Sequence, residues 1–228
     1  MPSFHTLAVH AGERMPRPDF TPVATPIYHS AAYIYEELDA LDGVFAGTRE
    51  GPVYARYGNP TLTALEAAVA ALEDGEASLS YASGMAAIHG ALLGAGARSS
   101  SAVVAAFDVY GATYTLLTSL LTELGVAVRF VDATDPAGVS LAVEETSPVA
   151  LLVETLSNPL LKVADLPKLA EAAHAAGAAF LVDNTFATPY LCRPLEFGAD
   201  YVIHSATKYL RLPRVAQLEA DHRPVSAR

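Results

Sequence analysis

The chain has 228 residues, of which 52% are hydrophobic and 17% charged, a composition that predicts a globular protein with one substantial core. Its formal net charge of -11 argues against a nucleic-acid surface, which would need clustered Lys and Arg, and its single cysteine, Cys192, excludes a disulfide framework. Without a charged leader, an apolar run of about 18 residues or a histidine cluster at ligand spacing, we expect a cytoplasmic protein with no membrane segment and no metal.

Residues 1–58 are rich in Pro, Tyr and Gly, and their prolines interrupt any long periodic pattern. We expect this segment to form an extended N-terminal arm. Regular structure is predicted from Pro60 onward, where Thr61 is placed to cap a helix that carries apolar residues at helical spacing and ends near Gly75. Residues 59–210 then form the predicted large domain.

From residue 77 onward, short apolar or β-branched runs alternate with Ala- and Leu-rich stretches. The runs predict strands near Ala77–Tyr81, Ala102–Ala106, Ala127–Val131, Val149–Glu154, Ala178–Asp183 and Tyr201–His204. The intervening stretches predict helices near Gly84–Gly96, Ala112–Leu124, Pro136–Thr146 and Asp165–Ala176. Strands that are apolar throughout and separated by helices predict an α/β fold, with a mostly parallel sheet covered by helices on both faces. Ligands bind such sheets beyond the carboxyl ends of the strands.

The stretch Asp200–Leu210 carries the first candidate for chemistry. Its apolar run ends in Ser205, Thr207 and Lys208, which would bring two hydroxyls and an amine to the edge of the sheet, a place suited to covalent chemistry on an anionic cofactor. The chain has only three lysines against eleven arginines, so Lys208 is less easily explained as surface decoration. Taken alone, however, a lysine after a strand is more often a solvated strand end.

Two further strand ends carry polar groups that suit a phosphorylated cofactor. Ser83-Gly84-Met85 follows a predicted strand and opens a predicted helix, where backbone N–H groups favour a phosphate, although an ordinary turn has the same pattern. Asp183 ends a buried apolar run, and a carboxylate there needs a cationic partner such as a protonated heterocycle, unless it is a simple helix cap.

Three loop features complete the candidates. Tyr110 lies just past a predicted strand, where its ring either stacks on a planar cofactor or packs against the protein. Asn158 either offers its amide to a ring substituent or belongs to a plain Asn-Pro turn. Tyr54 and Arg56 stand two apart in an extended segment and so share a face suited to phosphate oxygens, although Arg56 also fits a surface arginine.

These motifs, taken together, resemble the Cys/Met-metabolism family of pyridoxal-phosphate-dependent enzymes over residues of about 4–210. That family includes cystathionine gamma-lyase, cystathionine gamma-synthase, methionine gamma-lyase and O-acetylhomoserine sulfhydrylase. The motifs that carry the resemblance are, in order, Tyr54-x-Arg56, Ser83-Gly84-Met85, Asp108-x-Tyr110-Gly111, Glu154-Thr155-x-x-Asn158-Pro159, Asp183-Asn184-Thr185 and Ser205-Ala206-Thr207-Lys208.

The resemblance implies an aspartate-aminotransferase-type (fold type I) large domain that binds pyridoxal phosphate. It implies that Lys208 forms the internal Schiff base, that Asp183 keeps the pyridinium nitrogen protonated, and that Tyr110 stacks on the ring. It assigns Tyr54 and Arg56 to the phosphate of a neighbouring subunit, so the active unit is expected to be a homo-oligomer, at least a dimer. We expect the chemistry from Lys208, Tyr54 and Tyr110, and the other cofactor contacts from Ser83, Gly84, Met85, Asn158, Thr185, Ser205 and Thr207.

Past Leu210 the resemblance stops. The composition changes over residues 211–228, and the C-terminal domain of the family, with its arginine for the substrate carboxylate, is not recognisable. We therefore expect a C-terminally truncated member, of the kind a frameshift would produce, with a divergent tail.

The resemblance also implies a reaction class. It implies gamma-elimination or gamma-replacement on an amino-acid substrate, either cystathionine or an activated homoserine. Ala112 stands where methionine gamma-lyases carry a cysteine, which favours the cystathionine enzymes. The alternative is an inactive remnant that binds cofactor or associates with a full-length homologue.

Overall fold

A computed structural model describes residues 21–210, and the chain divides into two compact units, Met1–Thr61 and Leu62–Arg228. The start of the predicted arm and the predicted tail at 211–228 lie outside the described residues. No helix between residues 21 and 210 is long and apolar enough to cross a bilayer.

In the described part of the segment expected to be extended, residues 21–58, the structure has a helix. Helix α2 (Leu38–Phe45) forms where no proline interrupts the chain and where apolar side chains recur three and four residues apart. Outside α2, residues 21–58 form no further helix and no strand, but Ala32 and Tyr54 form an antiparallel bridge.

Helix α3 (Pro60–Glu73) corrects the predicted cap. The helix is capped by Asn59 and not by Thr61. Asn59 Oδ1 accepts a hydrogen bond from the backbone N–H of Thr61 at 2.9 Å. Asparagine is a stronger cap than threonine, and Pro60 suits the first helical position because its fixed φ matches the helix. The helix therefore begins at Pro60, before the residue that was expected to cap it.

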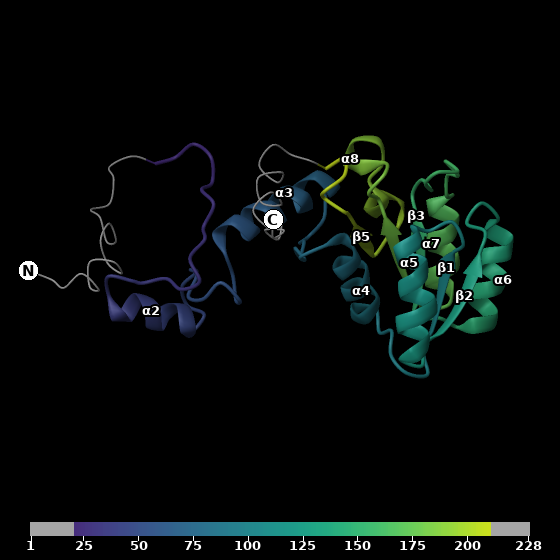
Figure 1. The fold of residues 1–228 in the computed structure, drawn as a ribbon, viewed down its shortest axis with the longest axis horizontal. Helices are drawn as coiled ribbons and strands as arrows, with labels where there is room; N and C mark the ends of the chain where they lie inside the picture. The colour runs from purple at the N-terminus through teal and green to yellow at the C-terminus, as the bar shows by residue number, and fades with distance from the viewer. Residues whose placement is uncertain (1–20, 211–228) are drawn as a thin grey trace, which may run out of the picture. The chain divides into compact units, whose positions relative to one another are not determined.

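The second unit is built on a five-stranded parallel sheet with the strand order β2-β1-β3-β4-β5 (Figure 1). Every pair of neighbouring strands is parallel, which confirms the predicted α/β class. The strands are β1 (Ala102–Ala106), β2 (Ala127–Val131), β3 (Ala150–Glu154), β4 (Ala179–Asp183) and β5 (Tyr201–Ile203), each within one residue of its predicted ends.

The strand expected at Ala77–Tyr81 is absent. The segment has no helix or strand assignment, and β5 pairs only with β4 among the described residues. Its composition favours a strand, but a strand also needs a hydrogen-bonded neighbour, and no described segment provides one.

Helices cover both faces of the sheet. Helix α4 (Gly84–Gly94) contacts β5 and α5 (Gly111–Thr115), and α5 continues as a π-helix over Leu116–Leu121 that contacts β2. Helices α6 (Pro136–Thr146) and α7 (Leu166–Ala175) contact each other (Figure 1). Helix α6 also contacts β1 and β2, and α7 contacts β4. Two short helices, α8 (Thr188–Leu191) and the 3-10 helix η2 (Pro194–Phe197), follow β4 and were not predicted.

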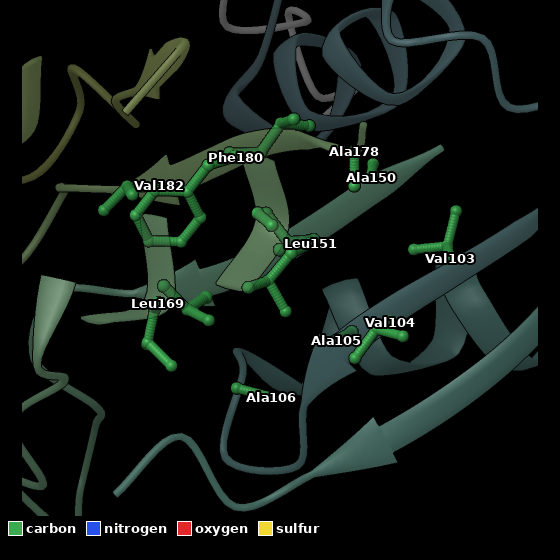
Figure 2. Close-up of a cluster of buried hydrophobic side chains, with 14 of the residues drawn as sticks. Val103, Val104, Ala105, Ala106, Ala150, Leu151, Leu169, Ala178, Phe180 and Val182 are labelled. Atoms are coloured by element: carbon green, nitrogen blue, oxygen red, sulfur yellow. The ribbon is translucent and has the colours of Figure 1, made fainter. Parts of the chain in front are cut away.

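The hydrophobic core lies around the three central strands. Strands β1, β3 and β4 are buried on both faces, as the uninterrupted apolar runs predict. Figure 2 shows Leu151 of β3, Phe180 of β4 and Leu169 of α7 grouped in this core, and each is 0% exposed. This packed centre fixes the strand ends at which the candidate site residues lie.

Candidate functional site

The predicted site residues of the second unit gather around one cavity of about 1550 Å³ at the carboxyl ends of β3, β4 and β5. The register brings these ends together, because Glu154 pairs with Asp183 and Asp183 pairs with Ile203. The predicted residues that line the cavity are Ser83, Gly84, Met85, Tyr110, Asn158, Asp183, Thr185, Ser205, Thr207 and Lys208.

The start of α4 meets the turn after β5 at very close range. A Cβ atom built on Gly84 would lie 2.9 Å from the Cβ of Ser205, so only glycine lets the two segments come so near. Ser83 caps the helix, since its Oγ accepts a hydrogen bond from Ala86 N at 3.1 Å. The first N–H groups of α4 and the Ser205 hydroxyl are thereby held in one place, which suits a phosphate.

The turn that carries Lys208 is fixed by its own hydroxyls. Ser205 N donates to Thr185 Oγ1 at 2.8 Å, and the Ser205 and Thr207 hydroxyls lie 2.9 Å apart. Lys208 N donates to Ser205 O at 3.0 Å, which closes the turn. The exposed Lys208 side chain lines the cavity next to these hydroxyls, where an amine can reach a bound electrophile.

Asp183 ends β4 and lines the same cavity. Its Oδ1 accepts a hydrogen bond from Thr185 N at 2.9 Å. Burial raises the pKa of the Asp183 carboxyl, while the hydrogen bonds from Thr185 and the nearby His204 act in the opposite direction. A buried carboxylate of this kind favours a protonated ring nitrogen as its partner.

Glu154 also lines the cavity, and the sequence motifs assigned it no role. Its Oε1 accepts a hydrogen bond from Tyr110 N at 2.6 Å, which fixes the start of α5 beside the cavity. Burial raises the pKa of Glu154 to about 7, and the charge of Asp183 acts in the same direction. Its sequence signals were its place at the end of an apolar run and its membership of the motif Glu154-Thr155-x-x-Asn158-Pro159.

Tyr110, Asn158 and Met85 also line the cavity. Tyr110 is 59% exposed, so its side chain is accessible to a planar ligand. Asn158 is exposed in the loop after β3, and Met85 Sδ lies 3.9 Å from the Thr113 hydroxyl.

Tyr54 and Arg56 belong to the first unit and are described within it. The Arg56 guanidinium lies over the Tyr54 ring, 5.4 Å from its centroid, and over the Tyr57 ring at 5.3 Å. The 44% exposure of Tyr54 leaves it open to a partner. Their assignment to a phosphate stays a prediction.

The cavity therefore combines an amine, a buried carboxylate, an exposed aromatic ring and a cradle of N–H and hydroxyl donors. This set fits a planar, protonatable ring that carries a phosphate and a carbon open to attack by an amine. Residues 21–210 contain no group of three or more His, Cys, Asp or Glu side chains placed to bind a metal ion.

Known proteins that are similar to this chain include enzymes whose names or structures involve pyridoxal phosphate. The sequence profile described as "Cys/Met metabolism PLP-dependent enzyme" matches residues 5–211. Among curated proteins, the chain is 39% identical over 208 residues to an L-methionine gamma-lyase of Porphyromonas gingivalis, covering 91% of this chain and 51% of the relative. It is 44% identical over 188 residues to a cystathionine gamma-lyase of Bacillus subtilis, covering 82% and 47% respectively.

Among solved structures, an O-acetylhomoserine (thiol)-lyase of Campylobacter jejuni superposes with a TM-score of 0.75 at 34% identity. The match covers 83% of this chain and 46% of that protein, whose structure contains N'-pyridoxyl-lysine-5'-monophosphate. The chain thus spans about half the length of the relatives that it matches.

Proposed function

Because the chain belongs to the family of Cys/Met metabolism PLP-dependent enzymes, we propose that it binds pyridoxal phosphate through Lys208 and acts on a sulfur amino acid or an activated homoserine. The reaction would be a gamma-elimination or a gamma-replacement.

One observation carries this proposal: a single cavity is lined by Lys208, Asp183, Tyr110 and the phosphate-binding candidates of α4 and the turn after β5. These residues come from segments more than a hundred positions apart in the chain. Any one of them has an ordinary structural explanation. Their convergence on one cavity supports a common ligand.

Lys208 is the proposed catalytic base as well as the attachment point. When bound, the cofactor supplies an electron sink that stabilises negative charge on the substrate's alpha carbon. Lys208 Nζ would take the alpha proton and return a proton at the neighbouring carbon, since Lys208 is the lysine that lines the cavity.

The other residues would hold the cofactor in place. Asp183 would keep a proton on the ring nitrogen, and Tyr110 would stack on the ring. The N–H groups at Gly84 and Met85, with the hydroxyls of Ser205 and Thr207, would bind the phosphate. Ser83, Asn158 and Thr185 would support the site from the adjoining loops.

Tyr54 and Arg56 are proposed to act in the site of a neighbouring subunit, which makes the active form a homo-oligomer. Their pairing supports this role, because a guanidinium next to a phenol can bind phosphate oxygens while the phenol takes part in proton transfer.

The proposed substrates are cystathionine and O-acetylhomoserine. Ala112, in α5 directly after Tyr110-Gly111, supports a cystathionine enzyme over a methionine gamma-lyase. Sequence identity does not choose between them, since both an L-methionine gamma-lyase and a cystathionine gamma-lyase are about 40% identical to this chain.

A second candidate is cofactor binding without turnover, or association with a full-length homologue. It is supported by the lining of the cavity, because Lys208, Asp183 and Tyr110 account for binding of a cofactor without any contact to a substrate.

The two candidates are separated by titrating the purified chain with pyridoxal phosphate and then adding substrate. We expect visible absorbance from the cofactor bound to Lys208, its loss in Lys208→Ala, and consumption of cystathionine or O-acetylhomoserine. Absorbance without consumption leaves the second candidate, and a wild-type chain that shows no absorbance refutes the main one.

A further inference from the structure

A buried carboxylate, that of Glu73, is among the residues that line the cavity and has no role in the proposed chemistry. Glu73, the last residue of α3, is only 3% exposed. Its Oε1 accepts a hydrogen bond from Asn184 Nδ2 at 2.9 Å and lies 2.5 Å from His204 Nε2. Burial of a carboxylate lowers the stability of a protein unless the group is well paired, so the presence of Glu73 at this position calls for an explanation.

The two partners of Glu73 stand next to the two parts of the cofactor site. Asn184 follows Asp183 directly and is fully buried, with its Oδ1 accepting from Thr155 Oγ1 at 2.8 Å. His204 directly precedes Ser205, which opens the turn that ends in Lys208. One oxygen of Glu73 thus holds the loop after β4 and the loop after β5.

The two loops are also linked directly. Asn184 N donates to Ile203 O at 2.9 Å, Ser205 N donates to Thr185 Oγ1 at 2.8 Å, and the Phe186 and Tyr209 rings pack edge to face with their centroids 5.3 Å apart. Glu73 adds an attachment from α3, outside the sheet, to residues of both loops. This additional attachment restricts the relative position of the two loops further.

From this geometry we propose that Glu73 is a positioning residue, which sets the distance between Asp183 and the Ser205–Lys208 turn by binding Asn184 and His204 together. The expected effect of Glu73 on cofactor binding rests on the proposed function, whereas its expected effect on the two loops does not.

The arrangement also places His204 beside Asp183. Burial raises the pKa of the Asp183 carboxyl, and the proximity of His204 opposes that rise. Glu73 keeps His204 in this place through Nε2, while Nδ1 of the imidazole is buried without a hydrogen-bond partner among the described residues. A His204 that is free to rotate would no longer act on Asp183 from a fixed distance.

The test compares three variants of the full chain. Glu73→Leu removes both contacts while keeping an apolar group of similar size, so it leaves little cavity. Glu73→Gln keeps the accepting oxygen and serves as the conservative rescue. Asp74→Asn, the matched control, removes a charge from the adjacent exposed residue, whose left-handed backbone asparagine tolerates.

The first measurement is amide hydrogen exchange without cofactor. In Glu73→Leu we expect exchange at 183–187 and 203–209 to be at least about tenfold faster, with β1 and β3 unchanged, as for the loss of hydrogen bonds to a charged group. Glu73→Gln should recover most of the protection. Unchanged loops, or faster exchange that extends equally to β1 and β3, would refute the positioning role.

The second measurement is the dissociation constant for pyridoxal phosphate, read from visible absorbance. It should rise about tenfold in Glu73→Leu and stay near the wild-type value in Asp74→Asn. A wild-type chain that binds no cofactor refutes the proposed function alone, because the exchange data still decide the role of Glu73. Wild-type affinity in Glu73→Leu would overturn the link between the loops and the cofactor site.

Discussion

The raised pKa of Glu154 makes a prediction about stability. Burial is the main cause that raises this pKa to about 7 from an ordinary 4.5, and the hydrogen bond from Tyr110 N only partly offsets it. Between these two pH values the folded protein keeps a proton that the unfolded chain has lost. The free energy of unfolding therefore falls as the pH rises through this window, and Glu154→Gln removes that dependence.

The magnitude follows from the two pKa values. The pKa of Glu154 is about 2.5 higher in the folded protein than in the unfolded chain. At about 1.36 kcal/mol for each pKa unit, this lowers the free energy of unfolding at high pH by at most about 3.4 kcal/mol. Solvent reaches part of the Glu154 side chain and screens the effect, so we expect about 2 kcal/mol. The penalty is absent below the unfolded pKa and complete above the folded one.

Urea unfolding of wild type and Glu154→Gln at about pH 5 and about pH 8 measures this difference. Relative to wild type, the variant should gain about 2 kcal/mol of stability between the two pH values. Glu144→Gln changes an exposed glutamate of α6 and should show no such gain. A difference between Glu154→Gln and wild type that does not depend on pH would refute the reasoning.

Three further predictions follow from the packing and the proposed site. Gly84→Ala would place a Cβ 2.9 Å from that of Ser205 and should weaken binding of pyridoxal phosphate about tenfold or more. Gly94→Ala is the control, because a Cβ there would have no atom within 4 Å, and its affinity should stay at the wild-type value. Equal affinities of the two variants would contradict the close approach. Leu181→Ala in β4 should lower the free energy of unfolding by about 2–5 kcal/mol in urea, since Leu181 is fully buried. The exposed Leu141→Ala should cost under about 1 kcal/mol, and a similar loss at both sites would count against the described core. If Arg56 acts in the site of a neighbouring subunit, mixing Arg56→Ala and Lys208→Ala chains should restore tight cofactor binding in part, and no recovery after subunit exchange would argue for action within one chain.

The three central strands were predictable because they are buried on both faces. The run Ala102–Ala106 is a strand with the predicted ends, since an apolar run between two helices has few other stable arrangements. Ala77–Tyr81 has a similar composition but no neighbouring strand, and pairing is a property of distant segments that a local pattern does not contain.

Those candidate site residues that lie at or just after the end of a strand could be predicted from the sequence. Asp183 is the last residue of β4, and Lys208 lies in the turn that follows β5, so the topology of a parallel sheet brings them to one edge. Glu73 gave no such signal, because its partner Asn184 is 111 positions away and the end of a helix is usually solvated. Buried polar clusters of this kind depend on contacts that only the folded chain reveals.

Reduction of the bound cofactor with borohydride, followed by peptide mass spectrometry, identifies the lysine to which pyridoxal phosphate is covalently attached. We expect the added pyridoxyl mass on the peptide that contains Lys208 and none in Lys208→Ala. Labelling of Lys162 or Lys168 instead, or no label on the folded wild-type chain, would contradict this expectation.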